Sequence, residues 1–420
     1  METPPRGPLI RHVDRRGTSQ APRHEVKAGS RHRSTPLRQD VQVADHDGTR
    51  VDTDAGFAER LLEVVDSGRR TATYKLALLL ALTDLCALRS DGNGRAPTEL
   101  ATRDIAEQVT ALYWPQVAPF RIDGSHETVE LRQITNRRST IIDSIRSFRT
   151  EAARTGATSL WTARRQLPSV YETVIDRVER TLAEQPLPRL QTVGTSETVF
   201  PFIYDLGIGW GPGQNFTIER LRSHGPRGPV IRLLPGAGDE LVRLSPLVRP
   251  LIELHWTRMV AHLSRVGTAE EDLRHHLFGS PRIAPSKMLR DGLRDLQSNR
   301  CFYCDDRLVG ATEVDHFIPR VRCANDAVEN LVLADRGCNG DKSDLLAAPS
   351  FVAEWAGRNR GQTANLAMIA EMSGTESDVR GTMAVARSIY RHLPPGGSPM
   401  WQGRRLVVRS DPRLALAHMG

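Results

Sequence analysis

Residues 301–344 read CFYCDDRLVGATEVDHFIPRVRCANDAVENLVLADRGCNGDKSD, and this stretch decides which fold and which chemistry can be expected. Four of the five cysteines of the chain lie in it, two of them as the pair Cys301 and Cys304. Two thiolates three positions apart can hold one metal ion from a tight turn, and Cys338 offers a third thiolate. An odd number of cysteines without a secretory signal favours a metal site over disulfide bonds. We therefore expect a structural zinc ion that stabilises a small fold.

The fourth ligand of this predicted zinc site can be assigned in two ways. Asp335 precedes Cys338 by three residues, so this pair repeats the spacing of the CxxC pair. A carboxylate is an acceptable zinc ligand, although Cys and His are more usual. We predict Asp335 as the fourth ligand, and Cys323 is the alternative.

Between the cysteines lie residue types that suit phosphodiester hydrolysis. The run EVDH at 313–316 predicts a strand, whose alternation would send Asp315 and His316 to opposite faces. This pair can supply an oxygen ligand for Mg²⁺ and a base for water. Asn330 can bridge the loop that follows the histidine. In the run CNGDK, Asn339 offers a carbonyl oxygen to a hard cation, and Lys342 offers a positive charge to phosphate.

Together these residues resemble the HNH endonuclease family, of the ββα-metal fold, in its cysteine-flanked form. The family pattern is a CxxC pair, then Asp-His with a following Pro, then Asn, then a helix with Cys-(His or Asn)-x-x-Lys. Asn330 and Asn339 stand 14 and 23 residues after His316, which is similar to the family's usual spacing. The positions that match are Cys301, Cys304, Asp315, His316, Pro319, Asn330, Cys338, Asn339 and Lys342.

The resemblance implies a role for each matched polar residue. His316 would be the general base, Asp315 and Asn339 would hold one catalytic Mg²⁺ or Mn²⁺, and Asn330 would fix the loop. We further expect Lys342 and Arg320 to contact phosphate. At two positions this chain departs from many members, because Asn339 replaces a His and Asp335 replaces a Cys.

The rest of the chain predicts an α+β protein that is mostly α. With 420 residues, of which 39% are hydrophobic and 25% charged, it has a soluble globular composition. Residues 1–38 hold nine basic residues against three acidic ones, so we expect 1–54 to be a disordered basic tail. Helical periodicity predicts a mainly helical module over 55–280, with a β-rich part near 196–235. The HNH nuclease domain is expected over 281–346, and a helical region over 347–420.

These features predict a DNA endonuclease that acts in the cytoplasm. No signal peptide is visible, and the apolar stretch 76–88 is too short to span a bilayer, so no membrane partner is expected. Residues 301–344 hold nine acidic residues against five basic ones, so DNA must be gripped mainly by other parts of the chain. A large module before an HNH centre is similar to bacterial restriction or anti-phage nucleases, where other defence proteins are expected partners. The alternatives are a zinc-stabilised DNA-binding protein without cleavage, and a mobile-element or toxin-like nuclease.

Overall fold

The computed structural model describes residues 54–66, 72–122, 127–136, 139–192, 201–206, 217–219, 229–267, 270–279, 286–310, 312–394 and 396–420. The chain divides into two units between residues 48 and 49, and all described residues belong to the second unit. The predicted tail therefore lies outside the described residues, except for its last position. Within the described part the fold is mixed α+β and mostly α, as predicted. No described helix has both the length and the apolar character that crossing a membrane requires.

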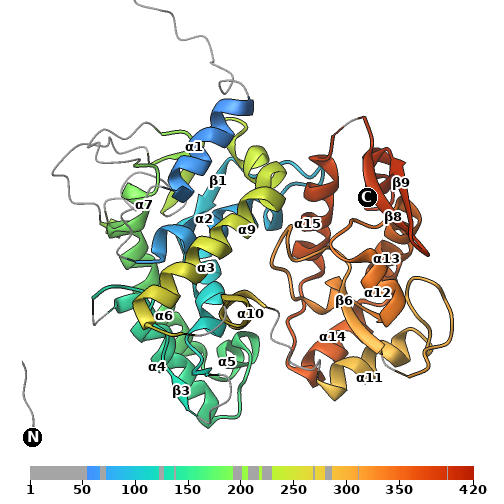
Figure 1. Ribbon diagram of the computed structural model, residues 1–420, viewed down its shortest axis with the longest axis horizontal. Coiled ribbons are helices and arrows are strands. Elements are labelled where there is room, and N and C mark those ends of the chain that lie inside the picture. The colour runs from blue at the N-terminus through green and yellow to red at the C-terminus, as the bar shows by residue number, and fades with distance from the viewer. Residues whose placement is uncertain are drawn as a thin grey trace, which may run out of the picture. The chain divides into compact units, whose positions relative to one another are not determined.

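The predicted N-terminal module is built from helices around a buried central one. Its helices are α1 (Asp54–Asp66), α2 (Tyr74–Leu88), α3 (Thr102–Gln116), α4 (Thr140–Arg154), α5 (Leu160–Gln166), α6 (Pro168–Glu184), α7 (Pro186–Arg189), α9 (Ala237–Ser264) and α10 (Glu270–Phe278). Every residue of α2 from Leu76 to Ala87 is buried, because apolar residues cover all of its faces. Helices α3 and α9 pack directly against α2 (Figure 1).

Among the described residues, this module also contains two small antiparallel sheets. Strands β1 (Glu99–Ala101), β5 (Val230–Leu233) and β4 (Tyr204–Asp205) form a sheet in the order β1-β5-β4. A second sheet pairs β2 (Phe120–Arg121) with β3 (Thr128–Val129). Strands β4 and β5 fall in the predicted β-rich part, of which residues 196–200, 207–216 and 220–228 lie outside the described residues.

The nuclease-like segment forms a ββα unit. It follows α11 (Lys287–Leu296) and contains β6 (Thr312–His316), the 3₁₀ turn η1 (Val328–Asn330), β7 (Leu331–Asp335) and α12 (Arg336–Lys342). The two strands pair antiparallel, with His316 opposite Leu331 and Thr312 opposite Asp335. Asp335 also begins α12, because its Oδ1 accepts a hydrogen bond from Cys338 N at 2.9 Å.

The C-terminal region contains α13 (Pro349–Gly361), α14 (Thr363–Ser373), α15 (Val379–Arg391) and α16 (Pro412–Leu416). Between α15 and α16 the chain forms a β-hairpin from β8 (Ser398–Gly403) and β9 (Leu406–Ser410). The helical region expected over 347–420 thus also contains a two-stranded sheet, which the sequence did not indicate. The strands are short, and their two-residue turn is Arg404-Arg405, which lacks the Asn-Gly or Asp-Gly pair that marks a hairpin in a sequence.

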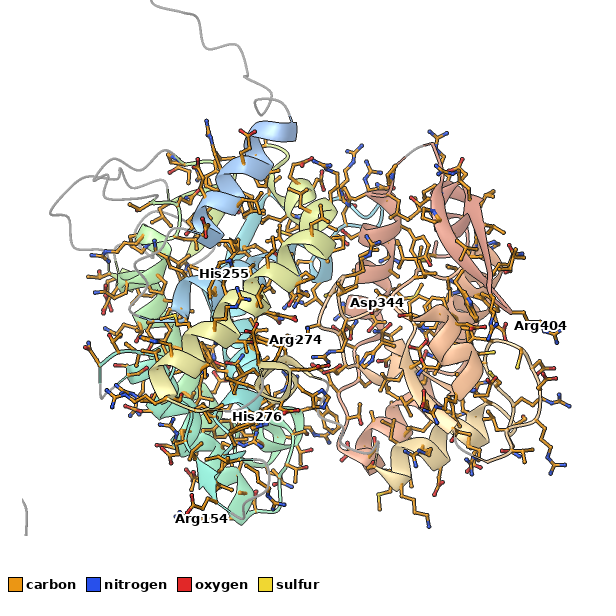
Figure 2. The ribbon with its side chains drawn as sticks, viewed as in Figure 1. Arg154, His255, Arg274, His276, Asp344 and Arg404 are labelled. Atoms are coloured by element: carbon orange, nitrogen blue, oxygen red, sulfur yellow. The ribbon has the colours of Figure 1, made fainter. Side chains whose placement is uncertain are left out.

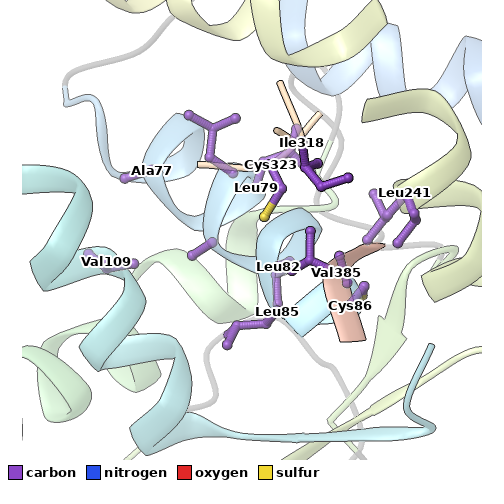
Figure 3. Close-up of a cluster of buried hydrophobic side chains, with 14 of the residues drawn as sticks. Ala77, Leu79, Leu82, Leu85, Cys86, Val109, Leu241, Ile318, Cys323 and Val385 are labelled. Atoms are coloured by element: carbon purple, nitrogen blue, oxygen red, sulfur yellow. The ribbon is translucent and has the colours of Figure 1, made fainter. Parts of the chain in front are cut away.

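The loop that follows His316 packs into the core around α2. Figure 3 shows Ile318 and Cys323 of this loop beside Leu79 and Leu82 of α2, with Val385 of α15 close by. The nuclease-like segment and the N-terminal helices therefore share one hydrophobic core.

A buried ion pair lies beside this shared core. Asp84 of α2 pairs with Arg249 of α9, and the two side chains are 0% and 4% exposed. Gln108 Nε2 also donates to Asp84 Oδ2 at 3.2 Å. Burial raises the pKa of the Cys323 thiol well above its ordinary value, and the adjacent Asp84 carboxylate adds to this rise. Cys323 is thus a protonated core residue.

Candidate metal and nuclease site

Three cysteines and one aspartate converge at the start of α12. Cys301 and Cys304 lie before β6, Asp335 ends β7, and Cys338 lies in α12. The ligand atoms of these four side chains all lie within 4.8 Å of one another. Zn–S bonds of about 2.3 Å place the sulfurs of a tetrahedral site roughly 3.8 Å apart, so small adjustments would close this cluster around one ion. The four residues could therefore hold a metal such as zinc, and Cys323 is not among them.

The backbone holds the turn with the CxxC pair in place. Asp305 N donates to Cys301 O at 3.0 Å, and Cys301 N donates to Asp306 O at 2.9 Å. Asp305 adopts the left-handed conformation, with a φ of 58°, which lets the chain turn sharply after Cys304. The thiol of Cys304 donates to Asp335 Oδ2 at 3.3 Å, so the turn is already tied to the end of β7.

The titration of this cluster predicts competition between protons and a metal. Desolvation raises the pKa of the Cys304 thiol to about 12, and Asp335 and Cys301 beside it add to the rise. Desolvation and the same carboxylate also raise the pKa of Cys338. Burial alone would raise the pKa of Asp335, but hydrogen bonds from Cys338 N and from the surrounding thiols lower it overall. A metal must therefore displace thiol protons, so metal retention should fall as the pH falls.

Asp315 lies on β6 and is held by two donors. The Tyr303 hydroxyl donates to Asp315 Oδ2 at 2.5 Å, and Lys342 Nζ lies 3.0 Å from the same oxygen. Lys342 also donates to His316 O at 2.9 Å, and its side chain is 0% exposed. The structure thus places Lys342 inside the ββα unit, which differs from the surface position that phosphate binding would need.

Asn339 faces β6 from α12, close to the carboxylates of that strand. Its Nδ2 donates to Glu313 Oε2 at 2.6 Å. Asn339 and Lys342 share one face of α12, and Glu313 and Asp315 share one face of β6, because of the helix and strand periodicities. The structure therefore brings Asp315 and Asn339 to the same β6–α12 interface. The Asn339 amide oxygen and a second carboxylate oxygen of Asp315 are donor atoms of the kind that Mg²⁺ prefers.

His316 ends β6 and is paired with an aspartate that the sequence did not indicate. Its Nε2 lies 2.7 Å from Asp326 Oδ1, and Asp326 also forms an ion pair with Arg320. Desolvation would raise the pKa of Asp326, but Arg320 and His316 outweigh it and hold that pKa well below its ordinary range. An ionised Asp326 can accept a hydrogen bond from Nε2–H, and the Nδ1 atom of His316 then keeps the lone pair that can accept a proton. Arg320 directs its guanidinium to this aspartate.

Asn330 closes the loop between His316 and β7 from inside. Its Oδ1 accepts from Ile318 N at 2.8 Å, while its Nδ2 donates to Ile318 O and Asn325 O, both at 3.0 Å. The side chain is 0% exposed. Because one amide satisfies three backbone groups, it fixes the path of the chain directly after His316.

Sequence reasoning missed three residues that touch the predicted site, namely Tyr303, Glu313 and Asp326. Tyr303 stands inside the CxxC run and Glu313 inside the EVDH run, so proximity to the motifs was their only signal. Asp326 follows His316 by ten residues, and only the folding of the loop brings the two together. No local pattern could have indicated that pair.

Two families of known domains match separate parts of this chain. The domain of unknown function DUF8808 matches residues 54–277, and the HNH endonuclease family matches residues 301–348. Neither a curated protein nor a solved structure matches the chain significantly.

The second match covers β6, β7, α12 and the Cys/Asp cluster, so the predicted HNH resemblance is confirmed. The first match covers the helices from α1 to α10 and more than half of the chain. We conclude that the protein belongs to the DUF8808 family and carries an HNH endonuclease domain after its family-defining region.

Proposed function

We propose that this protein is a metal-dependent endonuclease that hydrolyses DNA phosphodiester bonds, with His316 as the general base. The observation that carries the proposal is the hydrogen bond between His316 Nε2 and Asp326 Oδ1, at 2.7 Å. It orients the ring and assigns the accepting role to Nδ1, as general-base catalysis requires. The HNH match supports the same chemistry, because HNH domains are typically nucleases that act on DNA.

In the proposed reaction, His316 Nδ1 takes a proton from a water molecule whose oxygen attacks phosphorus. The bond between phosphorus and the 3′ oxygen breaks, and that oxygen leaves opposite the attacking water and takes up a proton. The products are a 5′ phosphate and a 3′ hydroxyl. Asn330 keeps the chain after His316 in one path, so the base stays in place during attack.

Asp315 and Asn339 are the residues that would hold Mg²⁺ or Mn²⁺, at the β6–α12 interface. A bound divalent cation would stabilise negative charge on the phosphate and on the leaving oxygen. Lys342 shares the Asp315 carboxylate, so it competes with a cation for that oxygen. We propose that Lys342 keeps Asp315 and the end of β6 ordered. Arg320 is paired with Asp326, so it would contact phosphate only with those donor atoms that Asp326 does not use.

Nicking of supercoiled plasmid with Mg²⁺, with Mn²⁺ and with EDTA tests this function. We expect open-circular and linear products with either cation and none with EDTA. Parallel reactions on modified and unmodified plasmid would show whether base modification matters. If the protein cuts neither modified nor unmodified plasmid with either cation, the proposed activity is wrong.

A second candidate function is DNA binding without cleavage. The observation that favours it is the Lys342 ammonium on Asp315, because this ion pair occupies a predicted cation ligand. The same nicking assay separates the two functions when it is combined with a DNA-binding measurement. Binding without nicking would support the second candidate.

We also propose that the Cys/Asp cluster binds structural zinc through Cys301, Cys304, Asp335 and Cys338. Cys301→Ser should remove most of the metal and lower the melting temperature, because metal binding contributes directly to folding. Elemental analysis of purified protein measures the zinc content. Cys323→Ala is the matched control, since Cys323 lies in the core, and it should keep its zinc. Loss of zinc from the control, or its retention by Cys301→Ser, would contradict this ligand set.

We further propose a role in restriction or anti-phage defence, in which the DUF8808 region helps to select the target. The support is the arrangement of a large domain before an HNH domain. The nuclease domain would then span 281–346, between the helical module and the C-terminal region. Phage plating on cells that express the parent protein or His316→Ala tests this role. Equal plating on both strains would contradict a defence role that depends on cleavage.

A further inference from the structure

The β8–β9 hairpin carries an exposed positive charge next to an acidic domain. Residues 398–410 contain Arg404, Arg405 and Arg409 and no acidic residue. All three arginines are exposed, and the Arg405 side chain is 91% exposed. Figure 2 shows the Arg404 side chain extending outward from the end of the hairpin. Neither of the two family matches covers this hairpin.

The turn of the hairpin is occupied by residues that its backbone disfavours. Gly403 pairs with Leu406, so Arg404 and Arg405 form a two-residue turn, which we call the hairpin tip. Their φ angles are 44° and 59°, in the left-handed region that Asn and Gly adopt more readily. Two arginines in these positions cost folding free energy that Asn-Gly would avoid. Strained positions of this kind tend to occur at functional sites.

The hairpin is fixed to the HNH domain through Trp401 of β8, by backbone hydrogen bonds and by ring packing. Trp401 N donates to Leu346 O at 2.8 Å, and Ala348 N donates to Trp401 O at 2.9 Å. The Trp401 ring packs edge-on against Tyr303, with ring centroids 4.9 Å apart. Tyr303 in turn donates to Asp315, so the hairpin is attached to the same residues that support the proposed cation site.

The hairpin tip lies beside α12. Arg405 Nε is 3.7 Å from Asp341 Oδ1, an exposed contact that neutralises little of the arginine charge. Asp341 and Asn339 are two positions apart on α12, so they point to roughly opposite sides of the helix. The tip and the proposed catalytic face are thus separated by about one helix diameter, roughly 10 Å. A DNA duplex carries about six phosphate charges along that length of its axis.

We propose that the hairpin tip binds the phosphate backbone of the DNA duplex that enters the nuclease site. This inference rests on the proposed function. Residues 301–344 are acidic overall and repel DNA, so positive charge from outside this segment is needed to hold DNA at the site. Forked guanidinium groups suit phosphate, and a rigid hairpin holds them at a constant position relative to α12.

The deciding variant is Arg404→Asn/Arg405→Gly, made in a full-length His316→Ala chain that does not cut the probe. Asn-Gly suits the turn, so its melting temperature should equal or exceed that of the single variant. Binding to a fluorescent mixed-sequence duplex is measured by anisotropy between about 50 and 200 mM salt. Loss of two phosphate contacts should reduce the slope of log affinity against log salt by about 1.8. Across that fourfold salt range, the affinity of the His316→Ala chain for the duplex should fall about 12-fold more than the affinity of the chain that also carries the hairpin substitutions.

Arg404→Lys/Arg405→Lys is the matched control, because it keeps both charges and should keep the slope. Arg404→Gln alone should reduce the slope by about 0.9, and this variant replaces the double variant as the test if the latter folds poorly. An unchanged slope in both charge-removing variants, alongside normal plasmid nicking by the parent, overturns the hairpin inference alone. A parent protein that neither binds nor nicks DNA overturns the proposed function together with it.

Discussion

His316→Ala is expected to slow DNA cleavage by about 10²–10⁴-fold, which is the usual contribution of a general base. The side chain is partly exposed at the end of β6, and its ring makes its hydrogen bond to the loop residue Asp326. Its removal therefore takes away the proton acceptor without opening the core, so the melting temperature should stay close to that of the parent. Initial rates of plasmid nicking, measured with saturating Mg²⁺, give the size of the effect.

A second His–Asp pair in the same chain provides the control for this variant. His392 Nε2 lies 2.9 Å from Asp239 Oδ1, away from β6 and α12, and its Nδ1 is engaged with Ser388 O at 2.7 Å. His392→Ala should leave the nicking rate within a few-fold of the parent. If the two variants cut DNA equally fast, His316 is not the base.

Asp84→Ala is expected to lower the free energy of unfolding by about 3–5 kcal/mol, as the loss of one partner of a buried ion pair does. The substitution leaves Arg249 charged and buried without its carboxylate, and it removes the acceptor of Gln108. Equilibrium denaturation in urea measures the change. Asp84→Ala/Arg249→Met should recover much of the loss, because no unpaired charge then stays buried.

Asp104→Ala tests whether burial is the reason for that effect. Asp104 pairs with Arg89 at 3.0 Å, but the two side chains are 31% and 50% exposed. Removing such a pair should cost about 0–1 kcal/mol. Equal losses for Asp84→Ala and Asp104→Ala would contradict the importance that we assign to the buried pair.

The sequence predicted those parts of the site in which the partners are close along the chain. The CxxC pair and the Asp335–Cys338 pair each fit on one turn, and the hydrogen bond from Phe302 N to Leu333 O on β7 helps to bring them together. The HNH resemblance rested on the same short spacings, and the family match confirms it. The spacing of residues along the chain was therefore enough to predict the HNH resemblance and the Cys/Asp cluster.

What the sequence did not predict depends on contacts between distant segments. Lys342 stands in a polar run and was expected at a phosphate, yet β6 covers it and Asp315 pairs with it. His316 meets its partner Asp326 only because the loop between them folds back. The hairpin was not predicted because its turn, Arg404-Arg405, lacks the residues typical of hairpin turns. Local sequence patterns do not reveal such contacts, because the contacts form only when the elements pack together.

The packing of Ile318 and Cys323 against α2 has a consequence for how members of this family can diverge. These two residues belong to the HNH domain, but Leu79 and Leu82 beside them belong to the DUF8808 region. A change of side-chain volume on α2 must therefore be matched by a change in the loop that leads from the proposed base, or the core loses its close packing. The two domains are expected to be inherited together, and a chimera that exchanges the HNH domain should fold well only if the facing residues of α2 are exchanged with it.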